Sequence, residues 1–331
     1  MRTTAYGKTA NGIAVDSWRL GDGGGIEATI ISYGARLASL TVPGPRGRVS
    51  VVLGCHGMAG WEADKSYLGA IVGRFAGRIE GARFELDGVE HRLSANDGAA
   101  CLHGGSPGFE RAVWQGSADG MGLLLRHASP AGEHGFPGTL ETTVRYSVRD
   151  GNALAIEYTA TTDAPTVLNL TNHAYFNLLG TGDIGGHEIT VAADSFVPVG
   201  PGLIQNGPPR PVAGTPFDLR APRLIGEGLA SGHEQIVVAG GYDHSFLVSH
   251  GPALSPRWIA RLAAGGIAMD CFTTQPSLQL YTGNFLDAAR RGAVCLETQH
   301  VPNAPNRPEF ASTVLRPGAV FRSETLYRFS G

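Results

Sequence analysis

Glycine is frequent and evenly spread in this chain of 331 residues, where 48 glycines separate short runs of apolar and β-branched residues. That is roughly twice the average share, and short runs between turn residues are typical of all-β proteins. The clearest example is Thr143 to Val148, which alternates apolar and polar residues before the turn residues Asp150-Gly151-Asn152 and the run Leu154 to Thr159. We predict a β-hairpin there.

Other segments share this pattern, and we predict strands at Glu27 to Ser32, Arg36 to Val42, Phe84 to Leu86, Gly122 to His127, Ile189 to Ala192, Ser245 to Ser249, Ile267 to Phe272 and Leu278 to Thr282. Helical patterns are few and short: Ala59 to Tyr67, Arg223 to Gly228 and Phe285 to Arg290. Strands at this spacing indicate stacked antiparallel sheets. Large all-β sandwiches reach this length as one unit, so we predict a single domain over residues 1–331.

Composition narrows the function classes. Hydrophobic residues make up 42% and charged residues 17%, as in a globular protein with a sizeable core. A net charge of -3 gives no basic surface for phosphates, so we expect no nucleic-acid partner. Because the segment Met1 to Lys8 has no apolar stretch and apolar residues nowhere run to eighteen, we expect no membrane partner and a cytoplasmic location.

The four cysteines, Cys55, Cys101, Cys271 and Cys295, lie far apart and form no C-x-x-C pair. This spacing indicates neither a zinc site nor a disulfide framework, and buried free thiols are the simplest interpretation.

Two segments place polar, titratable residues inside apolar runs. They are Asn169 to Leu178, which contains His173, and Leu296 to His300, which contains Glu297. A strand or its edge tolerates such groups only where they are hydrogen-bonded or used in a site. A histidine and a glutamate are therefore candidates for one site.

With five further blocks, these segments resemble the aldose 1-epimerase (galactose mutarotase) family over nearly the whole chain. The seven blocks run in the family's order: Gly73 to Ile79, Leu102 to Gly105, Asn169 to Leu178, Gly214 to Arg220, Tyr242 to Phe246, Gln279 to Asn284, and Glu297 to His300. The resemblance implies a large antiparallel two-sheet super-sandwich, with a monosaccharide site in a cleft on one sheet face.

The resemblance also implies a reaction, the interconversion of α and β anomers of free aldohexoses such as glucose and galactose. Ring opening removes the proton of the C1 hydroxyl and protonates the ring oxygen, so two proton-transfer groups must face one pocket. By their matching positions, Glu297 is expected to be the general base and His173 the general acid. The reaction requires no cofactor and no metal. The simpler alternatives are a core histidine satisfied by backbone and a solvent-facing strand glutamate.

Four further residues match the family's sugar-binding positions: Arg78, His103, Asp243 and Gln279. Arg78 and Asp243 together offer donors and acceptors suited to vicinal hydroxyls. The alternatives are a surface ion pair between Arg78 and Glu80, and turn roles for His103 and Asp243. His244 and His300 are weaker candidates and are left outside the predicted site.

One residue departs from the family pattern, and two other features resemble a dinucleotide-binding motif and a metal site. Relatives commonly carry Asn before the arginine that matches Arg78, whereas Gly77 stands here, so one substrate hydrogen bond is lost. The segment Gly180 to Gly185 fits G-x-G-x-x-G, but no helix follows it, and we read it as a loop. The histidines and Glu297 lack the short spacing of common metal motifs, and we expect no metal site.

Two alternatives to this function stay open. One is a mutarotase for another sugar, such as a pentose or a hexose 6-phosphate. A site for the phosphorylated sugar would require additional cationic residues near the cleft. The other is a non-catalytic sugar-binding module, because a fold alone does not imply catalysis. The sequence also leaves open whether the chain is a monomer or a homodimer.

Overall fold

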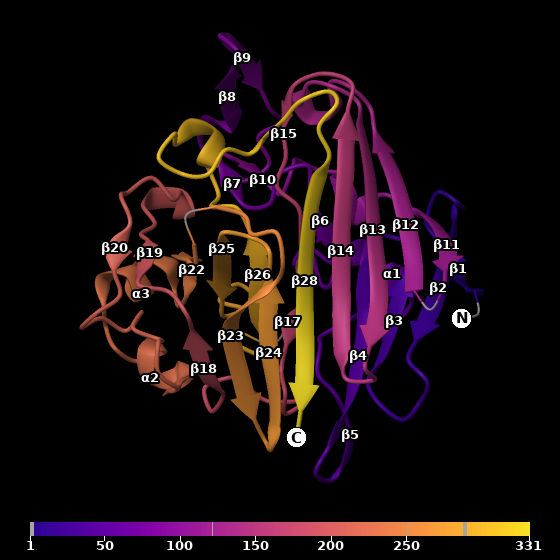
Figure 1. The fold of residues 1–331 in the computed structure, drawn as a ribbon, viewed down its shortest axis with the longest axis vertical. Helices are drawn as coiled ribbons and strands as arrows, with labels where there is room; N and C mark the ends of the chain where they lie inside the picture. Colours follow the sequence, from indigo (N-terminus) through magenta and orange to yellow (C-terminus); the bar gives the residue numbers. More distant parts are fainter. Residues whose placement is uncertain (1–2, 121, 250, 287–289) are drawn as a thin grey trace.

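The computed structural model describes residues 3–120, 122–249, 251–286 and 290–331, and it is built mainly from antiparallel strands (Figure 1). The largest sheet has nine strands. In spatial order they are β11 (Gln115–Asp119), β12 (Gly122–Ser129), β13 (Leu140–Arg149), β14 (Ala153–Thr162), β28 (Phe321–Ser330), β24 (Ile267–Thr273), β23 (Arg257–Ala264), β18 (Glu188–Val191) and β21 (Arg223–Leu224).

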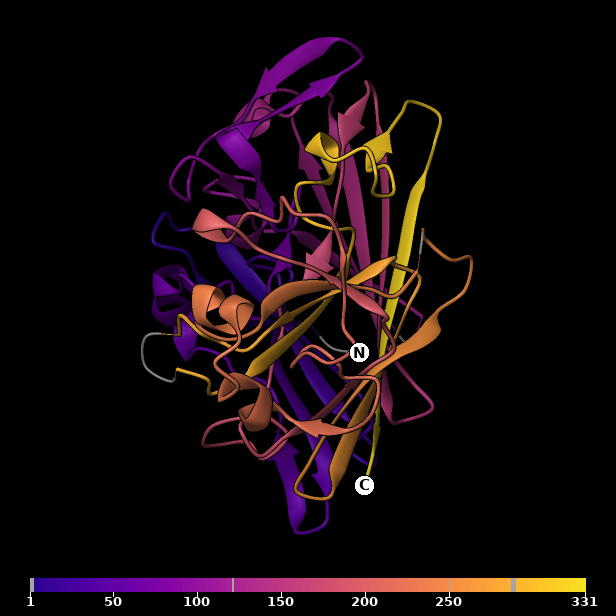
Figure 2. The ribbon, with the colours of Figure 1, turned by 90° about the vertical axis from the view of Figure 1, so that its left-hand side faces the viewer.

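Two further sheets lie against it. The five-stranded sheet runs in sequence order: β1 (Thr3–Lys8), β2 (Ala14–Leu20), β3 (Glu27–Ile31), β4 (Arg36–Gly44) and β5 (Gly47–Ser50). The six-stranded sheet has the order β17 (Tyr175–Phe176), β26 (Val294–Gln299), β25 (Ser277–Tyr281), β22 (Asp243–Leu247), β19 (Ser195–Val197) and β20 (Arg210–Pro211). Figure 2 shows the long strand β28 at one side of the molecule and the N-terminal strands toward the other.

Four two-stranded pairs complete the β-structure: β10 (Cys101–Leu102) with β7 (Arg78–Ile79), β15 (Thr166–Val167) with β27 (Val314–Leu315), β16 (Thr171–Asn172) with β6 (Ile71–Val72), and β8 (Arg83–Leu86) with β9 (Val89–Arg92). Short 3-10 turns occur at Glu80–Ala82, Phe109–Arg111, Glu133–Gly135, Pro201–Leu203 and Ala304–Asn306.

One large apolar core joins the three main sheets. It contains Ile30 of the five-stranded sheet, Val144 and Ile156 of the nine-stranded sheet, and Leu280 and Leu296 of the six-stranded sheet, all at most 1% exposed. Burying one such side chain contributes about 1.5–3 kcal/mol. The nine-stranded sheet thus packs across this core against the other two, which confirms the predicted antiparallel super-sandwich.

The predicted hairpin is confirmed, because β13 and β14 pair from Leu140 with Thr162 to Arg149 with Ala153 around the turn. The other predicted strands also correspond to observed ones, with ends that differ by at most two residues. The segment Gly180 to Gly185 is a loop, as predicted. All four cysteines are free; Cys101, Cys271 and Cys295 are buried, whereas Cys55 is only partly buried.

The helix predictions were less accurate. Helix α1 (Gly57–Ala63) starts earlier and ends before Tyr67, and α2 (Ile225–Leu229) begins after a short strand. Phe285 and Leu286 are not helical, and residues 287–289 of that predicted helix lie outside the described residues. Helix α3 (Glu234–Ala239) was missed. Among the described residues, none of the helices is long and apolar enough to cross a membrane.

Candidate active site

The six-stranded sheet presents one face to the core and the other to a cavity of about 660 Å³. Side chains alternate along each strand. On β26, Leu296 therefore joins the core while Glu297 and Gln299 line the cavity, and on β25 Leu280 joins the core while Gln279 lines the cavity. A cavity of this size is in the range of small-molecule sites.

The lining includes every residue that the sequence assigned to the site: Arg78, His103, His173, Asp243, Gln279 and Glu297. They come from six segments spread over more than two hundred residues. The register of the sheet explains part of this convergence, because Gln279 pairs directly with Glu297 and Asp243 pairs with Tyr281.

His173 and Glu297 face each other inside the cavity. Nε2 of His173 lies 3.7 Å from Oε1 of Glu297, and both side chains are almost completely buried. The main chain fixes His173, since its N–H donates to the carbonyl of Ala70 at 2.8 Å and its carbonyl accepts the N–H of Gly69 at 2.9 Å. Glu297 lies inside β26 and is buried, so it is not the solvent-facing strand glutamate of the alternative interpretation.

Two aromatic rings stack against the imidazole of His173. The ring of Tyr175 stacks at 5.0 Å between centroids and that of Tyr67 at 6.0 Å, with interplanar angles of 21° and 22°. Tyr67 also approaches His103, with ring centroids 4.6 Å apart. Tyr175 belongs to the segment Asn169 to Leu178 but was not predicted as a site residue. Tyr67 was missed because it lies on a loop with no motif to mark it.

Burial shifts the pKa values of the pair in opposite directions. Desolvation lowers the pKa of His173 to about 4, and a hydrogen bond with its own backbone and the nearby charge of Asp64 offset only part of this effect. Desolvation raises the pKa of Glu297 well above its ordinary value, the charge of Asp243 raises it further, and Arg78 lowers it. Both shifts favour a carboxylic acid beside a neutral imidazole, and such a pair of shifted groups is suited to acid and base roles.

Arg78 forms an ion pair, but not with Glu80 as in the alternative interpretation. Its Nε donates to Oδ2 of Asp97 at 2.6 Å. Glu80 instead accepts from Asn303 at 3.3 Å. Asp97 was missed because it follows a short loop far from Arg78 in sequence. It also lines the cavity.

Asp243 and Gln279 form one hydrogen-bonded unit. Nε2 of Gln279 donates to Oδ1 of Asp243 at 2.6 Å, while its Oε1 accepts from Ser245 at 2.6 Å and from Gln205 at 2.9 Å. These bonds fix the orientation of the amide and therefore keep Asp243 as an acceptor. Asp243 begins β22 and is not a turn residue.

His103 is held by the backbone. Its Nδ1 accepts the N–H of Gly77 at 3.2 Å, and its own N–H donates to the carbonyl of Gly77 at 3.1 Å. Desolvation, with the charges of His173 and Arg78, lowers its pKa well below the ordinary value. A neutral ring with Nδ1 accepting carries its proton on Nε2, so His103 is a donor. A Cβ at Gly104 would lie 2.1 Å from the carbonyl of Gly73, so the close approach there requires glycine.

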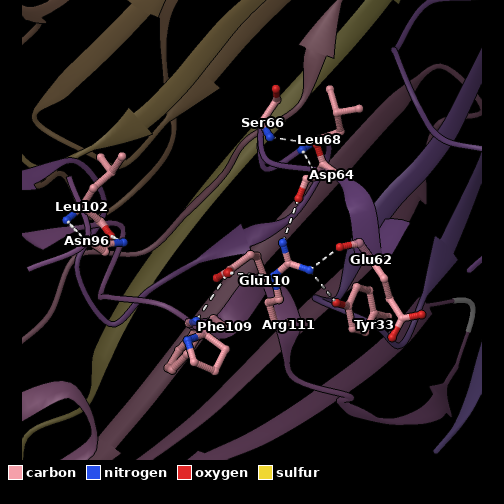
Figure 3. Close-up of polar contacts among 12 residues, drawn as sticks. Tyr33, Glu62, Asp64, Ser66, Leu68, Asn96, Leu102, Phe109, Glu110 and Arg111 are labelled. Atoms are coloured by element: carbon pink, nitrogen blue, oxygen red, sulfur yellow. Dashed lines mark hydrogen bonds and ion pairs between the residues drawn. The ribbon is translucent and has the colours of Figure 1, made fainter. Parts of the chain in front are cut away.

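A polar network supports the wall that carries Tyr67 (Figure 3). The carboxylate of Asp64 accepts the N–H groups of Ser66 at 2.8 Å and Leu68 at 3.0 Å. Arg111 donates to the carbonyls of Glu62 at 2.6 Å and Asp64 at 2.9 Å. Behind this network, Arg36 forms a buried ion pair with Asp64 at 2.8 Å.

The segment before His103 is held in the same manner. The side-chain amide of Asn96 accepts the N–H of Leu102 at 2.7 Å and donates to its carbonyl at 3.0 Å, as Figure 3 also shows. The cavity wall is therefore preorganised by side-chain-to-backbone hydrogen bonds.

Pro302 occupies the space beside Gly77. Gly77 has φ 79°, and a Cβ there would lie 2.4 Å from Cγ of Pro302. Any side chain at position 77 therefore requires a change at position 302. The replacement of the family's Asn by Gly77 is therefore linked sterically to the presence of Pro302.

His173, Cys295 and Glu297 place donor atoms within 4.8 Å of one another, and this is the one such metal-binding candidate among the described residues. The short contacts use opposite ring nitrogens, because Sγ of Cys295 lies 3.6 Å from Nδ1 and Glu297 lies 3.7 Å from Nε2. The lone pairs of the two nitrogens point away from each other. One ion therefore cannot lie within both contacts, and the donor set fits a resident metal poorly.

The family model described as aldose 1-epimerase matches residues 16–328. The chain belongs to the aldose 1-epimerase family. The rat protein named galactose mutarotase is 40% identical over 320 residues, which cover 92% of this chain and 91% of that protein. The Escherichia coli protein named aldose 1-epimerase is 36% identical over the same number of residues, with 92% of each chain covered.

Solved structures from the aldose 1-epimerase family share this fold. The C. elegans aldose epimerase homologue superposes with a TM-score of 0.89 at 30% identity, covering 96% of this chain and 99% of that one. The galactose 1-epimerase of Lactobacillus acidophilus gives a TM-score of 0.88 at 26% identity, with 99% and 98% covered. The predicted family and fold class are confirmed.

Proposed function

We propose that this protein is an aldose 1-epimerase that interconverts the α and β anomers of free aldohexoses such as glucose and galactose, with Glu297 and His173 as its proton-transfer groups. Family membership makes the chain an isomerase that acts on sugars, which favours an enzyme over a non-catalytic binding module. The observation that carries the residue assignment is the separation of 3.7 Å between Nε2 of His173 and Oε1 of Glu297 inside the cavity.

That separation suits the reaction. It is longer than a hydrogen bond, so the two groups do not bind each other and both stay available to a substrate. Both can then reach the two oxygens of one hemiacetal carbon. In ring opening, Glu297 removes the proton of the C1 hydroxyl, the bond from C1 to the ring oxygen breaks, and its electron pair stays on that oxygen. His173 then protonates the ring oxygen. Rotation about the C1–C2 bond exposes the other carbonyl face, and the same steps run in reverse.

The pair must hold one exchangeable proton for this cycle. A carboxylate with an imidazolium is one arrangement, and a carboxylic acid with a neutral imidazole is the other. The lowered pKa of His173 and the raised pKa of Glu297 both favour the second arrangement, which an exposed histidine and glutamate would hardly populate. Each well-placed proton transfer contributes roughly 10²–10⁴-fold to the rate.

The other four residues suit hydroxyl recognition. His103 offers Nε2–H, Arg78 offers guanidinium donors, and Asp243 offers an acceptor that Gln279 orients. Hydroxyls both donate and accept, so this mixture orients a sugar through several bonds. We assign Arg78, His103, Asp243 and Gln279 to substrate binding.

The charge of the lining bears on the phosphorylated-sugar alternative. The cavity is lined by the cations Lys65 and Arg78 and by four carboxylates, those of Glu80, Asp97, Asp243 and Glu297. Arg78 is already paired with Asp97. A phosphate would meet more negative than positive groups, which favours a neutral sugar.

Polarimetry of freshly dissolved α-D-glucose and α-D-galactose at low buffer concentration tests the proposal. We expect faster approach to the same final rotation, with glucose 6-phosphate and a pentose such as xylose as comparison substrates. Saturable galactose binding without acceleration would instead indicate a binding module. The cytoplasmic location, the single domain and a monomeric or homodimeric state stay predictions.

A further inference from the structure

Cys295 contacts the proposed catalytic histidine from outside the cavity. Its Sγ lies 3.6 Å from Nδ1 of His173, on the opposite side of the ring from Glu297. Cys295 is 0% exposed and is not among the residues that line the cavity. It can therefore act on the reaction only through His173.

The sheet explains this placement. Cys295 and Glu297 are two residues apart on β26 and so lie on the same face. Tyr175 pairs with Cys295 across β17 and β26, and His173 precedes Tyr175 by two residues. The imidazole consequently lies over this part of β26, with one ring nitrogen near the thiol and the other near the carboxylate.

Few polar groups compete for Nδ1. The rings of Tyr67 and Tyr175 stack against the imidazole, and the ring of His103 lies roughly perpendicular to it with centroids 5.3 Å apart. Within the part of the chain that the structure describes, Sγ of Cys295 is the side-chain hydrogen-bonding partner found for this ring. The other acceptor is the backbone carbonyl of His173 itself, which also accepts the N–H of Gly69.

The two roles of His173 require a proton on Nδ1 at every stage of the reaction. When His173 acts as an acid, it is an imidazolium that carries protons on both nitrogens. When it acts as a base, its Nε2 must offer a lone pair, so the remaining proton is on Nδ1. Nδ1 is thus protonated in each state that takes part in the reaction, and it needs an acceptor.

We infer that Cys295 is a positioning residue whose sulfur accepts the Nδ1–H of His173 throughout the cycle and leaves Nε2 as the nitrogen that exchanges a proton with the sugar. This inference rests on the role proposed above for His173. During ring opening the proton on Nε2 moves to the ring oxygen, the proton of the C1 hydroxyl moves to Glu297, and the proton on Nδ1 stays in place.

Sulfur suits this task because it is a weak acceptor. A carboxylate at the same position would hold Nδ1–H more firmly but would also stabilise the imidazolium and weaken it as an acid. The thiol stays neutral, since desolvation and the charge of Glu297 raise the pKa of Cys295 well above its ordinary value. Its own S–H is a weak donor whose burial costs little.

Three variants test the inference. Cys295→Ala removes the acceptor, Cys295→Ser replaces it with a hydroxyl oxygen, and Cys271→Ala is the matched control because it removes a fully buried thiol on β24. The tautomer of neutral His173 is read from the nitrogen chemical shifts of protein with ¹⁵N-labelled histidine, assigned with His173→Gln. Polarimetry then gives kcat and KM for galactose.

We expect the Nδ1–H tautomer in the wild type, the control and Cys295→Ser. In Cys295→Ala we expect a shift toward the Nε2–H tautomer and a fall in kcat of up to about tenfold, because fewer molecules hold Nε2 in the reactive state, with KM within about twofold of the wild type. Cys295→Ser restores most of kcat.

Two results would overturn the inference: an Nε2–H tautomer in the wild type, or an unchanged tautomer and kcat in Cys295→Ala relative to Cys271→Ala. If Cys295→Ala does not fold, the tautomer in the wild type and the tautomer and kcat of Cys295→Ser still test the inference. The spectra do not depend on turnover. A wild type that fails to accelerate mutarotation therefore contradicts the proposed function, while the tautomer measurement separately supports or overturns the contact with Cys295.

Discussion

Gln279 and Glu297 are directly paired across the neighbouring strands β25 and β26, and both side chains line the cavity. The pairing sets the proposed base beside the amide that orients Asp243. Proton transfer and hydroxyl recognition therefore share one rigid sheet face, which favours precise placement of the reacting carbon.

Replacing Glu297 by Gln keeps the size of the side chain but removes its ability to accept a proton. We expect kcat to fall by roughly 10²–10⁴-fold, the contribution of one general base, while galactose binding measured by calorimetry changes little. Glu141→Gln, an exposed change on β13, is the control and should leave kcat unchanged. A wild-type kcat in Glu297→Gln would contradict the assigned base.

The pH profile of kcat/KM should report the pair rather than either residue alone. We expect activity to rise with pH through about 4, as His173 loses the second proton of the pair. Activity should stay high while one proton is shared, and fall where pH exceeds the raised pKa of Glu297 and the last proton leaves.

Asp243→Asn checks which group sets the alkaline limb. The charge of Asp243 raises the pKa of Glu297, so its removal should move that limb to lower pH. An alkaline limb that stays in place would show that another group controls it.

Gly77→Asn alone should destabilise the protein by about 1–3 kcal/mol, because its Cβ would lie 2.4 Å from Cγ of Pro302. Asn tolerates positive φ, so the backbone itself is compatible with the change. We expect Gly77→Asn with Pro302→Gly to recover part of the relative loss, which a double-mutant cycle in urea measures. Simple additivity of the two changes would contradict the steric coupling.

Asp64→Asn leaves the charge of Arg36 buried without its ionic partner. We expect the free energy of unfolding to fall by about 3–5 kcal/mol, as when one member of a buried ion pair is removed. KM should also rise, since Asp64 holds the N–H groups of Ser66 and Leu68 on either side of Tyr67.

Asp119→Asn is the matched control for that change. It breaks an ion pair with Arg145 in which the Asp119 side chain is 50% exposed. We expect a loss of at most about 1 kcal/mol in urea unfolding. Equal losses of unfolding free energy in the two variants would show that the buried ion pair stabilises the protein no more than the exposed one.

Local sequence determined the strands and the identity of the chemical groups. Alternation with a period of two predicted the β13–β14 hairpin, and the polar residues inside apolar runs marked His173 and Glu297. Short helices were poorly predicted, because five to seven residues carry little periodic signal and their stability comes from packing.

The tertiary structure decided how those groups meet. The sequence did not show that Glu297 is enclosed within β26, that Arg78 pairs with Asp97, or that Cys295 faces Nδ1 of His173. Each depends on strand register and on contacts between residues far apart in the chain. A pattern of period two determines which side chains share a face, but only the packing of the sheets determines which face is buried and what lies opposite it.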